Sequence, residues 1–486
     1  MQRSGDKLEE YRKRILSGPV LPTMLWLAWP VIVANIINIS YNLIDAYWLG
    51  KIGKEAFGAP TVSWPMIMLF HSIGFGFTSA GISLISQYQG AGERRMAEKS
   101  AGMLLAFTLL IGVTITIAGI ALSPLILKLM GVPEDIYPLA VSYSTIIFTG
   151  EFIAILGFAF ITIANSFGDT RTPMIFTSAS ALLNMVLDPI MIFGYFGFPA
   201  LGVAGAALAT VLSRLLVAGA GLYYLLHRGF HGIRVRLEDM RIEGWWVRKV
   251  VGIGTPLSIQ MAGNSLGFTV MASIVSRFGS TVVGAYGLAI RVIDIMQAIT
   301  WGFMRASSIM IGQNIGAEYY DRAREIARKS MLYVFTLLLI GSIMIYLFRV
   351  QLISFFINDP EVIRVGSELI EIFVWSIPFF GVFFIGNAIA RGSGHTRAMT
   401  AIALIRLWIL RIGFSILLAL YAGMGPRGIW IAMSISNFGA GLMAILWVTR
   451  WTWLKRVVEL PSEKPRIPQP AREVIKAKER LTNPND

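Results

Sequence analysis

The sequence has no cysteine, so it can form no disulfide bond and offers no thiolate ligand to a metal. Charged residues are scarce, at 14% of the chain against about 25% in soluble domains. Only 4 histidines occur in 486 residues, and no His-rich or acidic metal motif falls within an apolar segment. A phosphate-binding loop is also missing. We therefore expect neither enzymatic activity nor an organic cofactor.

Long apolar runs are what the sequence does contain, and 55% of its residues are hydrophobic. A membrane-spanning helix needs about 20 mostly apolar residues. We count twelve such segments, at about 24–49, 60–87, 101–123, 138–162, 173–194, 201–226, 248–276, 282–311, 330–348, 365–389, 398–420 and 428–449. They are too long and too uniformly apolar for barrel strands, so the sequence predicts an all-α polytopic membrane protein. The first run is also too long for a cleavable signal and is expected to remain as a span.

Lysine and arginine are distributed unequally between the loops on the two sides of the membrane. With the N-terminus inside, 30 of the 42 basic residues fall in inside segments and 7 in outside segments. Cytoplasmic loops of membrane proteins carry this excess, so both termini are predicted to be cytoplasmic in a cell-membrane protein. The net charge of +14 then points to anionic membrane lipids as partners and not to nucleic acid.

The chain contains two copies of one unit, related by a constant offset that carries Pro30 onto Pro256. At this offset "QYQGA" (87–91) matches "QNIGA" (313–317), and "GDTR" (168–171) matches "GHTR" (394–397). Six spans per copy make the repeat parallel, which predicts two six-helix lobes around a central cleft. The predicted divisions are an N-terminal segment (1–23), an N-lobe (24–226), a linker (227–247), a C-lobe (248–450) and a basic tail (451–486).

Over about 20–450 the chain resembles the multidrug and toxic compound extrusion (MATE) family. The resemblance rests on the repeat and on "YNLIDAYWLGKIG", "NSFGDTRTP", "LLNMVLDPIMIFG" and "LGVAGAALATVLS". The last two motifs look most like the DinF-like prokaryotic branch. The resemblance implies a secondary antiporter without cofactors that exports small amphipathic, often cationic compounds in exchange for protons or sodium. We expect a monomer, with conformational hinges at Pro30 and Pro256.

Two acids break the repeat. At the same offset, Asp45 corresponds to Met271 and Asp188 to Phe414. A carboxylate near the centre of a span costs roughly 2.5–3.5 kcal/mol. Because the fold is shared between the halves and these acids are not, they indicate a function local to the N-lobe.

Depth places these acids in one layer with two neutral residues. Asp45 and Asp188 lie about 8 and 9 Å below the outer ends of their spans, at 1.5 Å per residue. Asn184 lies one turn deeper than Asp188, and Thr210 is about 14 Å into its span. Their hard oxygens suit a proton or Na⁺, and the resemblance points to the same four residues. The alternative is that both acids hydrogen-bond to neighbouring helices and only stabilise the packing of the helices.

Other polar residues in the spans could line the cleft. The candidates for substrate contact are Tyr41, Gln260, Arg291 and Asp294. Arg291 and Asp294 are three residues apart and could instead neutralise each other. Gln260 is neutral where other branches of the family can place an acid, which weakens the case for a second ion site in the C-lobe.

A flippase for lipid-linked substrates is the alternative function, because a related fold superfamily supports it. Its cavity should be cationic, and Arg291, Arg305, Arg406 and Arg411 keep this possibility open. Glu151 and the arginines near mid-depth should face the cleft or one another rather than lipid. His71 is expected to be packed or hydrogen-bonded and not a ligand.

Overall fold

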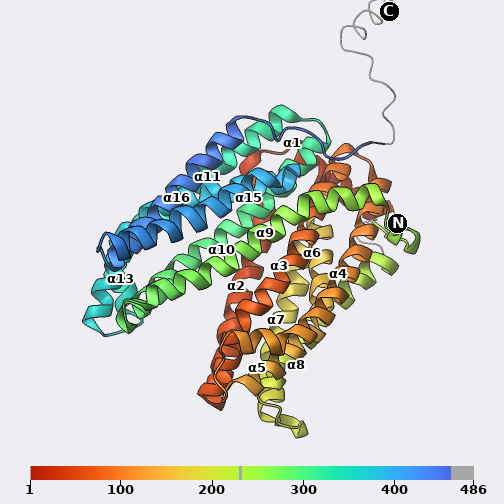
Figure 1. The fold of residues 1–486 in the computed structure, drawn as a ribbon. Helices are drawn as coiled ribbons and strands as arrows, with labels where there is room; N and C mark the ends of the chain where they lie inside the picture. Colours follow the sequence, from red (N-terminus) through yellow and green to blue (C-terminus); the bar gives the residue numbers. More distant parts are fainter. Residues whose placement is uncertain (1, 229–232, 461–486) are drawn as a thin grey trace, which may run out of the picture.

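The computed structural model describes residues 2–228 and 233–460, and nearly all of this part of the chain is helical. Figure 1 shows two groups of long helices that follow one another in sequence. The first group and the helix before it are α1 (Gln2–Ser17), α2 (Val20–Ile52), α3 (Lys54–Ala91), α4 (Arg94–Leu129), α5 (Tyr137–Thr149), α6 (Glu151–Ser166), α7 (Arg171–Phe193) and α8 (Val203–Tyr223). We call α2–α8 the N-lobe.

The second group, the C-lobe, is connected to the first by a short π-helix, η2 (Tyr224–Arg228), and a 3₁₀ turn, η3 (Leu237–Met240). Its elements are α9 (Gly244–Ser276), α10 (Ser280–Gly316), α11 (Tyr320–Leu347), α12 (Arg349–Ser354), α13 (Pro360–Phe373), η4 (Val374–Ser376), α14 (Ile377–Ser393), α15 (Thr396–Leu404), the π-helical η5 (Ile405–Gly413) and η6 (Ile416–Tyr421), and α16 (Pro426–Thr449). α3 and α10 begin at repeat-related residues, each directly after a glycine with positive φ, Gly53 and Gly279.

Each of the twelve predicted spans coincides with a helical segment, which confirms the predicted fold class. Among the described residues, nine helical segments are long and apolar enough to cross a membrane, and two bent pairs raise that number to eleven. The bends are 46° between α5 and α6 and 43° within α10. The remaining predicted span is α9. It is a continuous helix of 33 residues, but its basic and small polar side chains lower its mean hydropathy.

The two lobes diverge from one end of the molecule (Figure 1). At their junction α3 packs along α9, and α10 packs along α2. These two pairings are equivalent under the repeat, because α2 corresponds to α9 and α3 to α10. Each lobe therefore contributes its first two spans to the interface, as a parallel repeat requires.

The predicted hinge residues lie inside the helices that make this junction. Pro30 is buried within α2, and Pro256 lies within α9. Both helices continue through their proline, which removes one backbone donor and weakens the helix locally. A bend at these points remains a prediction.

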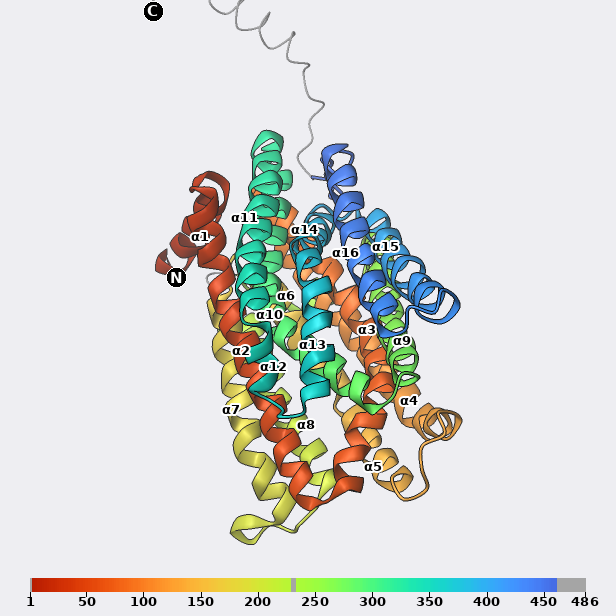
Figure 2. The same cartoon turned by 90° about the vertical axis from the view of Figure 1, so that its left-hand side faces the viewer.

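The N-terminal segment, outside the spans, lies against both lobes. Arg12 of α1 donates to Gly90 O at 3.0 Å, and Arg322 of α11 donates to Gly18 O, so the N-terminal segment contacts both lobes. Figure 2 shows α1 beside α11 at this end of the molecule. We call it the closed end, and the opposite end the far end.

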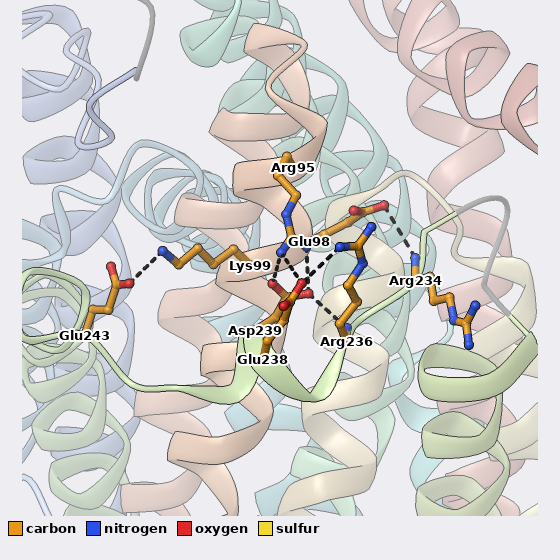
Figure 3. Close-up of polar contacts among 8 residues, drawn as sticks. All are labelled: Arg95, Glu98, Lys99, Arg234, Arg236, Glu238, Asp239 and Glu243. Carbon is orange, nitrogen blue, oxygen red and sulfur yellow. Dashed lines mark hydrogen bonds and ion pairs between the residues drawn. The ribbon is translucent and has the colours of Figure 1, made fainter.

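Ion pairs with α4 hold the segment between the lobes against the N-lobe. Arg95 on α4 pairs with Asp239 at 2.7 Å and with Glu238 at 3.1 Å, and Lys99 pairs with Glu243 at 2.6 Å (Figure 3). Asp239 is 1% exposed and also accepts from the Arg236 N–H. The predicted linker is thus a docked element over its described residues.

Candidate functional site

The two acids that break the repeat lie on neighbouring helices of the N-lobe. Asp45 is on α2 and Asp188 on α7, and these helices pack against each other. The two carboxylates are close enough for their charges to interact. Asp188 is fully buried, and Asp45 is half-buried. Neither oxygen of Asp188, nor the buried Oδ1 of Asp45, has a hydrogen-bond partner among the described residues.

The two neutral residues of the predicted layer adjoin Asp188. Asn184 lies one turn before Asp188 on α7 and is buried. Its Nδ2 donates to Oγ1 of Thr210 on α8 at 3.5 Å, which leaves the Asn184 Oδ1 without a partner among the described residues. Pro189 has no N–H, so the carbonyl of Met185 lacks its helical donor. The layer therefore offers carboxylate, amide and hydroxyl oxygens, the ligand types that Na⁺ and protons favour.

Three further side chains border this layer. Tyr41 lies one turn from Asp45 on α2, and Tyr143 on α5 is 7% exposed and adjoins both acids. Arg214 on α8 is close to both tyrosines. Tyr143 was not predicted for this layer, because nothing in the sequence around it distinguishes it from other span tyrosines. Arg214 could have been singled out, because a charge inside a span is itself a signal.

A second buried carboxylate in the N-lobe has a partner. Glu151 is fully buried at the break between α5 and α6, and its Oε1 is 2.6 Å from His71 Nδ1 on α3. His71 is therefore hydrogen-bonded, as expected, and Glu151 is turned away from lipid but faces His71 instead of the predicted arginines. The His71 ring also packs on Phe75, 4.3 Å between centroids. The pair connects α3 to the α5–α6 break.

The predicted cleft residues of the C-lobe are Gln260, Arg291 and Asp294. Gln260 on α9 is 5% exposed and donates to Asn387 Oδ1 on α14 at 2.8 Å. Arg291 on α10 is exposed. The side chain of Asp294 lies outside the described residues, so its pairing with Arg291 stays a prediction. In the described part of the chain, no three His, Asp or Glu side chains are placed so that they could hold a metal ion together.

Two arginines are buried in the C-lobe on the π-helical segment η5, a geometry that often accompanies function. Arg411 donates to Ser436 Oγ at 3.0 Å and to Asn437 Oδ1 at 2.9 Å. Arg406 is 2% exposed and lies over the rings of Phe380 and Phe383. Its Nε and Nη1 have no hydrogen-bond partner among the described residues. Neither arginine pairs with a carboxylate in that part of the chain.

At the closed end the lobes contact each other directly. Gln87 Nε2 donates to Gly392 O at 3.2 Å, and Gln313 Nε2 donates to Ser166 O at 2.9 Å. A Cβ added to Gly90 would lie 1.9 Å from Gln313 O, so only glycine allows this approach. The equivalent Gly316 is as close to α3, with a Cβ 2.0 Å from Gln87 O. At these two glycines the backbones of the two lobes are in direct contact.

Comparison with known proteins agrees with this architecture. The MatE family model matches residues 30–190 and 256–417, and the two stretches begin at the repeat-related Pro30 and Pro256. A probable multidrug resistance protein of Bacillus subtilis, YpnP, is 30% identical over 91% of this chain and 98% of its own. Another from that organism, YoeA, is 29% identical over 88% of this chain and 93% of its own.

The fold is also shared with solved structures. The crystal structure of a MATE protein in complex with MaL6 superposes with a TM-score of 0.84 at 22% identity, covering 90% of this chain and 97% of that one. The family match spans both halves of the repeat, which confirms the resemblance seen in the motifs. The chain belongs to the MATE family and is a multi-pass membrane transporter, not an enzyme.

Proposed function

We propose that this protein is a multidrug exporter that exchanges amphipathic organic compounds, chiefly cations, for protons or Na⁺ by alternating access. The observation that carries the proposal is the pair of acids Asp45 and Asp188, three of whose four carboxylate oxygens are buried without a hydrogen-bond partner in the described part of the N-lobe. Buried charges without partners are costly, so a protein retains them where a ligand neutralises them. The names of the Bacillus relatives support the class of substrate.

The arrangement of the lobes supports the direction of transport. With the termini in the cytoplasm, the closed end faces inward and the far end, where the lobes diverge, faces outward. Asp45 and Asp188 then lie in the outer half, within reach of ions from outside. Asp45 sits on a helix of the lobe junction, since α2 packs on α10, and Asp188 sits on α7, which packs on α2.

We propose that ion binding at the carboxylate layer is coupled to substrate release through the conformation of the N-lobe. A bound proton or Na⁺ relieves the repulsion between the two carboxylates. It can drive a change of state only if it binds one state better than the other. We propose that occupancy reshapes α2 at Pro30 and so disfavours substrate binding in the outward-facing state. Exchange of one proton for one monovalent cation is electroneutral, so each pH unit supplies about 1.4 kcal/mol. No organic cofactor and no second subunit takes part.

The test is export of a fluorescent cation from proteoliposomes, with pH and Na⁺ gradients imposed separately. Asp45→Asn mimics a permanently neutral site, so export should fall at least tenfold while the protein stays folded and inserted. The matched variant Asp294→Asn in the C-lobe should retain most of the activity. Export by Asp45→Asn at the wild-type rate, with unchanged pH and Na⁺ dependence, would show that Asp45 serves packing only.

A second candidate, transport of phosphate-bearing lipids, is favoured by Arg406 alone. Its guanidinium is buried with two nitrogens unpartnered and without a carboxylate among the described residues. Neutralising Arg406 and Arg411 together should abolish lipid headgroup transport and spare export of cationic dyes, if lipid is the substrate. Loss of dye export, with no lipid transport by the wild type, would remove this candidate.

A further inference from the structure

A basic hollow lies at the closed end of the C-lobe, away from the carboxylate layer. Its volume is about 460 Å³, and three helices form it: the start of α9, the start of α15 and the end of α16. The side chains that matter here are Arg248, Lys249, Arg397 and Trp447. They come from positions far apart in sequence, so the hollow exists only in the folded C-lobe.

The positive charge of the hollow is largely uncompensated. Arg248 and Arg397 are exposed and make no ion pair or side-chain hydrogen bond within the described ranges. Lys249 pairs with Glu459 at 2.9 Å, but Glu459 is 90% exposed, so water screens this pair. Burial lowers the pKa of the neighbouring His395, whose ring is therefore neutral at pH 7. The arginines and the lysine supply the charge.

The backbone adds to this field. The hollow includes Gly394, His395 and Thr396, where α15 begins, and no side chain caps the first-turn N–H groups of that helix. A helix N-terminus carries about half a positive charge and free donors. Basic side chains and a helix start on one wall favour an anion with several oxygens, and phosphate has that chemistry.

The surroundings of the hollow favour a lipid over a free phosphate. Val251 follows Arg248 by three residues on α9, and Leu446 directly precedes Trp447 on α16. Both are displaced from those residues toward the far end and are exposed, at 40% and 61%. Trp447 lies between the basic and apolar zones, where aromatic side chains mark the membrane interface. The basic side chains could bind a phospholipid headgroup while the exposed apolar side chains beside them contact its acyl chains.

We propose that this hollow binds the phosphate of an anionic phospholipid from the cytoplasmic leaflet. The choice of the cytoplasmic leaflet depends on the proposed orientation of the protein, but lipid binding at the hollow does not. A bound lipid would also act on the lobe junction, because Val457 in the wall of the hollow donates its N–H to Gln87 Oε1 at 2.9 Å. An occupied site thus holds the segment after α16 against the N-lobe and stabilises the closed end.

A second basic hollow, in the described part of α11, provides a control. It is about 560 Å³ in volume and includes Arg324 and Lys329 on α11. Four of its five charges are paired within one helix, Arg324 with Asp321 at 2.8 Å and Lys329 with Glu325 at 2.6 Å. The fifth, Arg328, lies over the Trp451 ring, so the hollow has a net charge of one. It should bind anionic lipid weakly, although its basic residues are similar.

The experiment titrates purified full-length protein in uncharged detergent with phosphatidylglycerol, phosphatidylcholine or inorganic phosphate, and follows the melting temperature. We expect phosphatidylglycerol alone to stabilise the protein. Arg248→Gln with Arg397→Gln should weaken its apparent Kd about 25-fold, taking about fivefold for each arginine. The control, Arg324→Gln with Lys329→Gln, should leave the Kd unchanged.

A charge-preserving variant, Arg248→Lys with Arg397→Lys, should retain most of the affinity even if the glutamine variant is unstable. Equal stabilisation by phosphatidylcholine, or an unchanged Kd in a folded glutamine variant, would overturn the proposal. Stabilisation by inorganic phosphate alone would assign the hollow to a small anion and refute the lipid. Because the assay uses detergent and no gradient, failure of the proposed antiport or orientation would not affect these outcomes.

Discussion

The side chains of Gln87 and Gln313 make the same contact in opposite directions across the lobe junction. They are repeat-related, and so are their acceptors, since the offset that carries Gln87 onto Gln313 also carries Ser166 onto Gly392. Both glutamines are fully buried. The closed end is therefore held by two equivalent hydrogen bonds around an approximate two-fold axis.

Removing these bonds should loosen the closed end. Gln87 also donates to Ser393 O and accepts from the Val457 N–H, so the two side chains make four hydrogen bonds in all. A net hydrogen bond contributes about 1 kcal/mol, roughly a fivefold change in an equilibrium, so Gln87→Ala with Gln313→Ala should favour opening at least about 25-fold. Because the chain has no cysteine, Ser393→Cys, which is buried at the junction, can report opening through its rate of maleimide labelling. Gln351→Ala, an exposed glutamine at the far end, is the control. An unchanged labelling rate in the double variant would show that the glutamines do not hold this end.

The orientation can be tested with two further single cysteines. Leu237, in the segment between the lobes, is 79% exposed, and Phe198, between α7 and α8, is 54% exposed. We expect Leu237→Cys to react only from the cytoplasmic side and Phe198→Cys only from outside, because basic loops stay inside. The check is labelling of intact cells with a membrane-impermeant reagent, before and after lysis. The reverse pattern would invert every depth assignment made above.

The His71–Glu151 pair should show strong coupling. His71→Leu leaves the fully buried Glu151 without its partner, which should cost about 3 kcal/mol of stability. The double variant, His71→Leu with Glu151→Gln, should recover part of that loss, since it leaves no lone carboxylate. Thermal unfolding of the single and double variants in one detergent gives the coupling. Simple additivity of the two changes would contradict a direct interaction.

The docked segment between the lobes should depend on Asp239 more than on its neighbour. Asp239 is 1% exposed and accepts from both Arg95 and the Arg236 backbone, so Asp239→Asn should lower stability by about 1–3 kcal/mol. Glu238 also pairs with Arg95 but is 62% exposed, so Glu238→Gln should change stability by less than about 0.5 kcal/mol. Melting temperatures decide between them. Equal effects would mean that burial at this contact is unimportant.

The fold class, the repeat and the family could all be predicted from the amino-acid sequence. Long apolar runs must become helices in a membrane, because only internal hydrogen bonds satisfy their backbone there. The constant offset between the two copies predicted equivalent lobes, and the family model matches at that same offset. The acids that break the repeat could also be found in the sequence, since a charge in a span is rare and costly.

Only the tertiary structure decided which side chains meet. Glu151 and His71 are 80 residues apart, and the sequence offered no sign that they share a hydrogen bond. Tyr143 joins the acid layer because α5 and α7 both pack around α8, a contact that periodicity does not encode. The basic hollow likewise combines the starts of α9 and α15 with the end of α16. Apolar helices of similar composition can pack in many ways, and the small residues and close backbone contacts that select one arrangement act only between helices already side by side.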